Sequence, residues 1–313
     1  MGTPEFARVS LEYLVKNKLN KLNKFDVIGV VTQPDKPVGR KMTLTPSAVK
    51  EYAANENIPV YQPQTLKGEE FFGLLKEFSP DIIIVAAYGK ILPKTVIDYP
   101  KYGCINVHAS LLPKYRGAAP INAAVIDGEK VTGITIIQMD YGIDTGDMIL
   151  RESIEIGENE MFGEVHDRLA QVGGKLLCEA LKQISDGTAK PEKQPEDGAS
   201  YVKKIDNDMC EIDWNMPSRA IHDKIRGLSP VPTAFTWLNG KKLQIYKSRI
   251  SDDSFSDGYK PGEVVSAVKG IGIKTGDNIM EIIELQIEGG KKMTAKDFIN
   301  GRRISEGAIL GEK

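Results

Sequence analysis

One stretch of this chain, CINVHASLLPKYRG at residues 104–117, constrains both the fold and the chemistry more than any other. Its first half alternates like a β-strand, in which side chains two positions apart point to the same face. Asn106 and His108 therefore project together, with their Cβ atoms roughly 6.5 to 7 Å apart. Residues 110–117 then predict a turn, followed by a helix that begins near Ala118. One small reacting group could contact the amide and the imidazole at once.

A histidine beside an amide donor suits acyl-type chemistry. The imidazole can move a proton while the amide steadies a developing oxyanion. An equally open alternative is that His108 and Asn106 satisfy buried backbone groups at the end of a strand. Local spacing alone does not decide between the two.

A second loop adds a carboxylate to this chemistry. Residues 133–139, GITIIQM, predict another apolar strand that runs into DYGIDTGD, where three aspartates stand among glycines: Asp140, Asp144 and Asp147. A carboxylate placed beside His108 would fix the tautomer of the imidazole and support its action as a base. The two loops together therefore favour a catalytic interpretation.

The combined pattern resembles the signature of a known family. N-x-H-x-S-L-L-P-x-x-R-G, followed by an aspartate in D-x-G-x-D-T-G-D, is similar to the signature of the folate-dependent formyltransferases. The likeness runs in order from GTPEFA at residues 2–7 through IRGLSPVPTAF at 225–235. It implies transfer of a formyl group from 10-formyltetrahydrofolate to the amino group of initiator methionyl-tRNA, for translation initiation.

Formyl transfer gives each member of the central trio a role. We assign Asn106 to the oxyanion, His108 to proton transfer, and Asp144 to holding the histidine and an ordered water. The resemblance also implies that one segment lines the folate site: Ser110, Leu111, Leu112 and Pro113.

Two further groups of residues are candidates for substrate contacts. Apolar side chains in AAYGKILP could form a slot for the pterin, with ordinary core packing as the open alternative: Tyr88, Ile91 and Leu92. Basic side chains of the loop at 32–46 could reach the acceptor end of a tRNA, with a solvated loop as the alternative: Lys36, Arg40 and Lys41.

Apolar runs and helical patterns alternate along the first half of the chain. Strands are predicted at 26–31 and 81–87, with helices at 47–56 and 67–78 between them. This repetition predicts an α/β domain with a doubly wound, mostly parallel, Rossmann-like sheet. Ligands bind beyond the carboxyl ends of strands in such sheets, which is where the loops described above begin.

The rest of the chain predicts a second domain. We expect a catalytic domain at 1–187, a linker rich in Pro, Lys and Glu at 188–205, and short strands with glycine turns at 206–313. The resemblance implies that this last domain is a small OB-like β-barrel that binds tRNA. Because residues 2–6 enter a helix directly, the first strand of the sheet is missing, and we expect further apolar residues ahead of Met1.

Composition narrows the remaining possibilities. The three cysteines lack the spacing of a disulfide framework or a zinc site, and the three histidines lack metal-ligand spacing, so we expect no metal. The net charge is −2, and residues 206–313 carry 16 basic and 16 acidic side chains, so tRNA contacts must come from local clusters. No apolar run is long enough to span a bilayer. We expect a cytoplasmic monomer with no membrane partner.

Two competing functions stay open at this point. One is a formyltransferase of the same fold that acts on a ribonucleotide or a nucleotide sugar, which would need neither the basic loop nor the barrel. The other is a tRNA- or folate-binding protein without catalysis. It would predict loss of the trio Asn106, His108 and Asp144, which is intact here.

Overall fold

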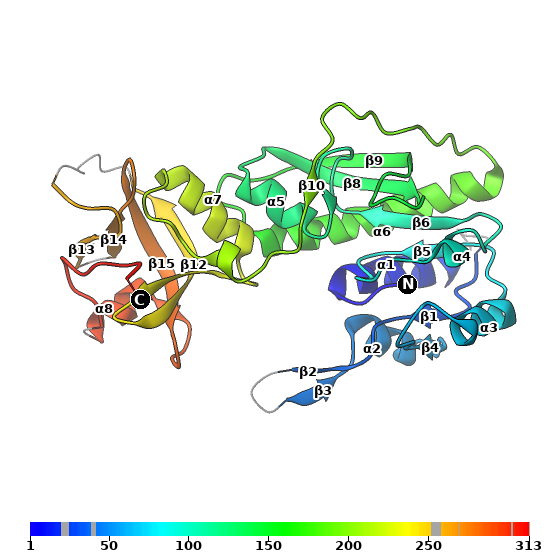
Figure 1. The fold of residues 1–313 in the computed structure, drawn as a ribbon, viewed down its shortest axis with the longest axis horizontal. Helices are drawn as coiled ribbons and strands as arrows, with labels where there is room; N and C mark the ends of the chain where they lie inside the picture. Colours follow the sequence, from blue (N-terminus) through cyan, green and yellow to red (C-terminus); the bar gives the residue numbers. More distant parts are fainter. Residues whose placement is uncertain (20–24, 39–41, 252–257, 269, 302, 313) are drawn as a thin grey trace. The chain divides into compact units, whose positions relative to one another are not determined.

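A computed structural model describes residues 1–19, 25–38, 42–251, 258–268, 270–301 and 303–312 (Figure 1). The chain forms two compact units. The first unit comprises Met1–Pro120, Thr132–Ile154 and His166–Val202, and the second comprises Ile121–Val131, Glu155–Val165 and Lys203–Lys313. Of the predicted linker, the residues as far as Val202 belong to the first compact unit. Within the described ranges, no helix combines the length and the apolar character needed to cross a membrane.

The first unit holds a four-stranded sheet of order β5-β6-β8-β9, with bounds Ile83–Val85, Cys104–His108, Val131–Gln138 and Asp147–Glu155. β5 pairs with β6 in parallel, and β6 pairs with β8 antiparallel. A separate parallel pair joins β1 (Val30–Val31) to β4 (Val60–Tyr61). The architecture is thus mixed α/β with parallel strand pairs, as the sequence predicts in outline.

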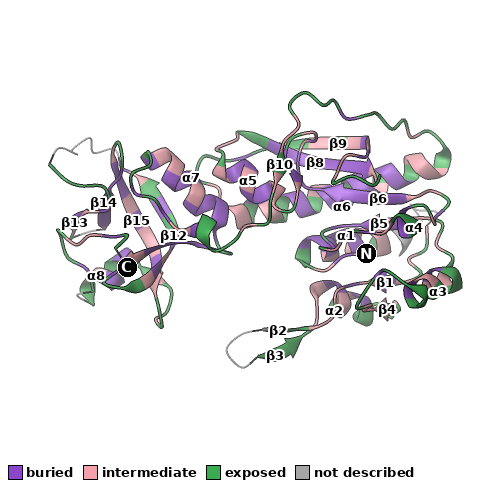
Figure 2. Cartoon of the chain, viewed as in Figure 1, coloured by how far each residue is buried: buried purple, intermediate pink, exposed green. Residues whose placement is uncertain are grey.

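The helices of this part of the chain are α1 Glu5–Leu19, α2 Ala48–Asn55, α3 Glu69–Phe78, α4 Lys94–Ile97, α5 Pro120–Ile126 and α6 Phe162–Asp186. The bounds of α2 and α3 lie close to the predicted 47–56 and 67–78, and α5 from Ile121 onward belongs to the second unit. Ser47 caps α2, because its hydroxyl accepts a hydrogen bond from the amide of Lys50. In α6, Gly173 lies against Val107 of β6 and Ile134 of β8, where an added Cβ would come within 3.1 Å of Val107. All five residues of β6 are buried (Figure 2), so this strand is covered on both faces.

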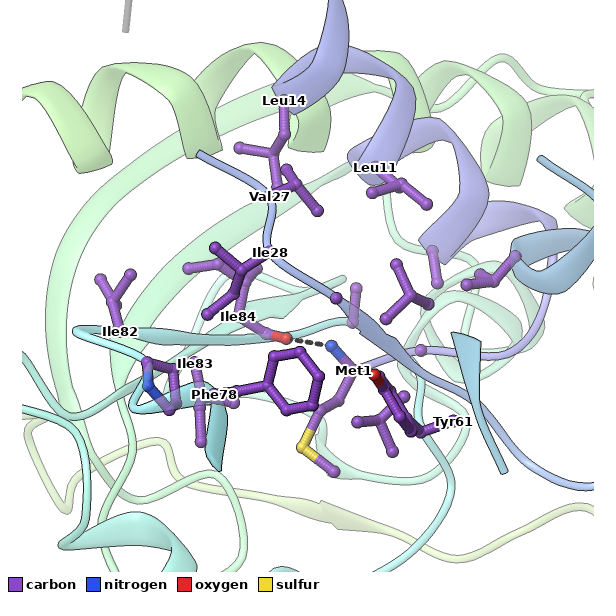
Figure 3. A pocket seen from close by; sticks show the side chains of 18 of the residues that line it. Met1, Leu11, Leu14, Val27, Ile28, Tyr61, Phe78, Ile82, Ile83 and Ile84 are labelled. Carbon is purple, nitrogen blue, oxygen red and sulfur yellow. Dashed lines mark hydrogen bonds between the residues drawn. The ribbon is translucent and has the colours of Figure 1, made fainter. Parts of the chain in front are cut away.

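The first two residues occupy the position of a short strand between β1 and β5. The Met1 amine donates to the carbonyl of Ile84, the amide of Ala86 donates to Met1, and the amide of Gly2 donates to Val31. Beside them lies an apolar cavity of about 180 Å³ (Figure 3), lined in part by Leu11, Leu14, Val27, Ile28, Phe78 and Ile82. The sequence predicts a strand at 26–31, but only its last two residues join a ladder. The others border this cavity.

Two short ladders complete the first unit. β2 (Lys36–Val38) pairs antiparallel with β3 (Thr43–Thr45). β7 (Arg116–Gly117) pairs in parallel with β10 (Tyr201–Val202), which lies within the stretch predicted to be a linker.

The second unit contains an antiparallel sheet of order β11-β12-β15-β14-β13, and β16 also pairs with β15. The strand bounds are Ala234–Leu238, Lys241–Ile250, Ile279–Ile287, Ile271–Lys274, Val264–Ala267 and, for β16, Met293–Thr294. Three helical segments accompany the sheet: η1 Asp208–Cys210, α7 Ser218–Leu228 and α8 Ala295–Asn300. All six lie within 206–313, the region where the sequence predicts short strands. Among the described residues no ladder joins β11 to β13, so the sheet does not close into a barrel.

Candidate functional site

The end of β6 and the loop after β8 bring an amide, an imidazole and a carboxylate together. Nδ2 of Asn106 donates to Oδ1 of Asp144 at 3.1 Å. Nδ1 of His108 lies 3.5 Å from Oδ2 of the same carboxylate. Asn106 and His108 are both buried, at 9% and 5% exposure, while the Asp144 side chain keeps 16%. The three residues predicted to be catalytic therefore meet in one place.

The shape of the second loop determines where the carboxylate points. Asp144 has a φ of +53°, a conformation that aspartate tolerates better than most residues. At Gly146 an added Cβ would come within 1.8 Å of the Gln138 carbonyl oxygen, so this position requires glycine. The backbone amide of Gly117 donates to Oδ2 of Asp144 at 2.9 Å, which ties this loop to the one after β6.

Both ring nitrogens of His108 face oxygen acceptors. Nε2 lies 2.9 Å from the carbonyl oxygen of Tyr115, and Nδ1 faces Asp144. Because a carbonyl oxygen can only accept, Nε2 carries the hydrogen and donates to Tyr115. Nδ1 then carries the lone pair of a neutral ring, and the Asp144 oxygen at 3.5 Å is farther from it than an ordinary N–H···O partner. Nδ1 is therefore the nitrogen that can take up a proton as a general base.

The segment predicted to line the folate site divides into two groups. Ser110 and Leu112 are fully buried. The Ser110 hydroxyl donates to the Lys114 carbonyl, and Leu112 packs in a small apolar cluster. These two side chains therefore stabilise the conformation of the loop and are not accessible to a ligand. Leu111 and Pro113 remain half-buried. Only these last two offer a ligand accessible side-chain surface.

The predicted pterin slot is also divided by the structure. Tyr88 and Leu92 are buried at 1% and 6% exposure within the core around α3 and β5. Their side chains have the packing role that the sequence left open as an alternative. Ile91, at 88% exposure, is the one of the three that faces solvent.

The basic loop is described only in part. Lys36 is exposed in β2, and its Nζ donates to Oε1 of Gln33 at 2.8 Å. Nε2 of Gln33 in turn donates to the Tyr88 carbonyl at 2.7 Å, which connects the base of this loop to the end of β5. Arg40 and Lys41 lie outside the described residues.

Sequence reasoning missed two side chains that support the site. Arg116, only 1% exposed, donates from Nε to Oε1 of Gln194 at 3.0 Å. Gln194 in turn donates to the carbonyl oxygens of Asp144 and Gly146. The motif contained Arg116, but Gln194 lies 78 positions further on, in the predicted linker, and no local signal pairs them.

Other chemistries fit this site less well. Burial raises the pKa of the Cys104 thiol to about 12, so it is protonated at neutral pH and is not a nucleophile. Within the part of the chain that the structure describes, no group of three or more His, Cys, Asp or Glu side chains could hold a metal ion.

The fold and the site define a class of protein. A mixed α/β unit that presents a buried amide, imidazole and carboxylate at a strand end has the groups that acyl transfer by proton transfer and oxyanion stabilisation requires. The chain belongs to the formyl transferase family. Residues 1–181 match the family described as "Formyl transferase", and residues 204–303 match "Formyl transferase, C-terminal domain".

Individual relatives are similar over almost the whole chain. The methionyl-tRNA formyltransferase of Caldanaerobacter subterraneus subsp. tengcongensis is 47% identical over 311 residues, covering 99% of this chain and 98% of the relative. That of Caldicellulosiruptor saccharolyticus is 47% identical over 312 residues, with the same coverage. A crystal structure of an N-formyltransferase from Helicobacter canadensis, in complex with folinic acid and dTDP-3-aminofucose, superposes with a TM-score of 0.66 at 24% identity. It covers 90% of this chain and 96% of that one, and supports the fold alone.

Proposed function

We propose that this enzyme transfers the formyl group of 10-formyltetrahydrofolate to the amino group of the methionyl moiety of initiator methionyl-tRNA. The observation that carries the proposal is the meeting of Asn106, His108 and Asp144 at the end of β6. Two relatives that are 47% identical over nearly their full length bear the name of this activity.

The residues of the trio divide the chemistry of the transfer. The methionyl amine forms a bond to the formyl carbon, and the bond from that carbon to the folate nitrogen breaks. One N–H of Asn106 binds Asp144, and the other donates to the oxygen that becomes negative at the formyl carbon. Because Nε2 of His108 donates to the Tyr115 carbonyl, Nδ1 is the nitrogen that takes the proton the amine loses, through the ordered water, and returns it to the departing folate nitrogen. Asp144 holds the imidazole and an ordered water.

The formyl donor is proposed to bind against the accessible apolar side chains of the two segments expected to contact it. Ile91 is exposed, and Leu111 and Pro113 are half-buried. These side chains would cover one side of a pterin ring, and Ser110 and Leu112 would hold their loop in shape. Tyr88 and Leu92 support the site from the core.

The first unit is proposed to be a doubly wound catalytic domain. The second unit is proposed to be an OB-like domain that binds the tRNA. Basic side chains on β12 are candidates for phosphate contacts: Lys241, Lys242, Lys247 and Arg249. Lys36, with Arg40 and Lys41, is proposed to contact the acceptor end. We further propose that the protein acts as a cytoplasmic monomer.

One assay tests the proposed reaction directly. The purified protein is mixed with 10-formyltetrahydrofolate and initiator methionyl-tRNA, and the product is hydrolysed and analysed for N-formylmethionine. The Asp144→Asn variant serves as the control for contaminating activity. A second reaction offers a dTDP-linked amino sugar instead of the charged tRNA. Formylation of the sugar without formation of N-formylmethionine would replace the proposed function with the small-substrate alternative.

A further inference from the structure

Residues 192–202, which we name the strap, join the two loops that form the site. At one end, Glu192 and Met148 exchange backbone hydrogen bonds of 2.8 and 2.7 Å at the start of β9. At the other end, the amide of Arg116 donates to the Ser200 carbonyl at 2.8 Å, and β10 continues the strap as a partner of β7. The strap therefore contacts the loop after β6 and the strand that follows the Asp144 loop.

Gln194 lies between the two ends of the strap, and both the nitrogen and the oxygen of its side-chain amide form hydrogen bonds. It is buried, at 8% exposure. Nε2 donates to the carbonyl oxygen of Asp144 at 2.7 Å and to that of Gly146 at 2.8 Å. Oε1 accepts from Nε of Arg116 at 3.0 Å. One side chain thus connects the backbone of the Asp144 loop to the loop after β6.

Arg116 is held in turn by the strap. Its Nη1 donates to the hydroxyl of Tyr201 at 3.0 Å, and its guanidinium carbon lies 5.5 Å from the centre of the Tyr201 ring. The guanidinium is nearly inaccessible to solvent, so it does not offer a surface to substrate. Arg116 therefore fixes the orientation of the Gln194 amide, with Oε1 toward Arg116 and both N–H groups toward the Asp144 loop.

We propose that Gln194 is a positioning residue, which sets the Asp144 carboxylate against His108 for formyl transfer. The inference rests on the proposed function. Gln194 contacts the backbone at Asp144 and Gly146 and acts only through the loop they belong to. Asp144 has a left-handed backbone, a conformation that a residue other than glycine keeps only while the surrounding contacts fix the loop. Displacements of about 1 Å can lower a rate by about a hundredfold.

The test replaces the donors while keeping the length of the side chain. Gln194→Met removes the two hydrogen bonds to the loop and the one from Arg116, and we expect kcat for methionyl-tRNA formylation to fall by about tenfold. The KM values for the folate and for the tRNA should stay within about twofold, since Gln194 touches neither. Gln194→Glu keeps an acceptor for Arg116 but cannot donate to the two carbonyls, and should lose as much. If one of the two variants fails to fold, the kcat of the other is sufficient for the test.

A double-mutant cycle separates positioning from general loss of stability. If Gln194 acts through Asp144, the tenfold effect of Gln194→Met should disappear in the Asp144→Asn background. A matched control is Gln286→Met on β15, which removes an amide hydrogen bond to the Gly290 carbonyl in the second unit. This control should leave kcat within about twofold.

Each outcome has one consequence. A wild-type protein that forms no N-formylmethionine overturns the proposed function and the inference with it. An active wild type whose kcat is unchanged in Gln194→Met and Gln194→Glu overturns the inference alone. So does a tenfold effect that persists undiminished in the Asp144→Asn background, because Gln194 would then act on the rate without Asp144.

Discussion

Oδ2 of Asp144 lies 3.5 Å from Nδ1 of His108, although His108 ends β6 and Asp144 lies in the loop after β8. The same oxygen accepts the amide of Gly117, and Oδ1 accepts from Asn106. The carboxylate therefore uses both of its oxygens to hold the groups that we assign to proton transfer and oxyanion binding. The effect of substituting His108 or Asp144 on the reaction can therefore be predicted from these contacts.

His108→Ala and Asp144→Asn should each lower turnover by at least about a hundredfold, because positioned acid-base groups contribute about that much or more. Binding of the folate should be largely kept, since neither side chain belongs to the proposed pterin surface. Steady-state kinetics and equilibrium titration with the folate measure the two effects separately.

A matched histidine provides the control for that experiment. His166 lies in α6, half-buried against Phe6 and beside Asp167. His166→Ala removes the same number of atoms and should leave turnover within about twofold. Near-normal turnover in either variant of the trio would remove that residue from the mechanism.

Arg40→Ala should lower turnover on charged tRNA more than it disturbs folate binding. The reason is that a basic side chain near the acceptor end positions the reacting amine, and positioning changes the rate as well as the affinity. Measuring kcat on initiator methionyl-tRNA and the Kd for the folate tests this expectation. Lys182→Ala, an exposed substitution in α6, is the control. Equal losses in both quantities would argue against a role at the acceptor end.

Much of the fold could be predicted from local patterns. The alternation at Cys104–His108 and the helical pattern at Ala48–Asn55 depend on neighbours in sequence, and both elements form where expected. The predicted strand at 26–31 is shorter, because a strand needs a hydrogen-bonded partner and periodicity does not supply one. Residues 25–29 border the cavity instead of a paired ladder.

The candidate site was predictable only where its residues share a motif. Strand geometry and the family resemblance predict Asn106, His108 and Asp144 as one group, and these three side chains lie together in the structure. The sequence does not predict the role of Gln194. The residues around it have the composition of a linker, and its hydrogen bonds join it to residues 48 and 50 positions earlier in the chain. Contacts of such sequence separation leave no periodic signal.

Acidification should destabilise the protein partly through His222. This side chain is 3% exposed, and its Nδ1 lies 3.0 Å from the Ser248 hydroxyl. Burial lowers its pKa, with Arg219 and Arg226 lowering it further and Asp223 opposing them. Below a pH of about 6.5 the unfolded chain binds a proton at this histidine that the folded chain does not bind. The free energy of unfolding should therefore fall as the pH drops through and below that value.

Urea unfolding of the wild type and of His222→Gln at several pH values between 7.5 and 5.5 tests this expectation. The variant starts less stable, because it loses a packed ring, but the difference between the two proteins should shrink on acidification by up to about 1.4 kcal/mol per pH unit. A constant difference across this range would exclude His222 as a source of the acid sensitivity.

An apolar extension of five residues ahead of Met1 should stabilise the first unit. Met1 already pairs with Ile84 and Ala86, so added residues would continue in parallel with β5 into the apolar cavity. Each apolar side chain buried there contributes about 1.5 to 3 kcal/mol, against about 1 to 2 kcal/mol for ordering its backbone.

The extension would also remove a buried amine, because burial lowers the pKa of the Met1 amino group to about 6. We expect a rise in the thermal midpoint of about 2 to 4 °C per kcal/mol gained. A Gly-Ser extension of equal length, which cannot fill the cavity, should give no such rise. Equal midpoints for the two extended proteins would show that the cavity does not accept a strand.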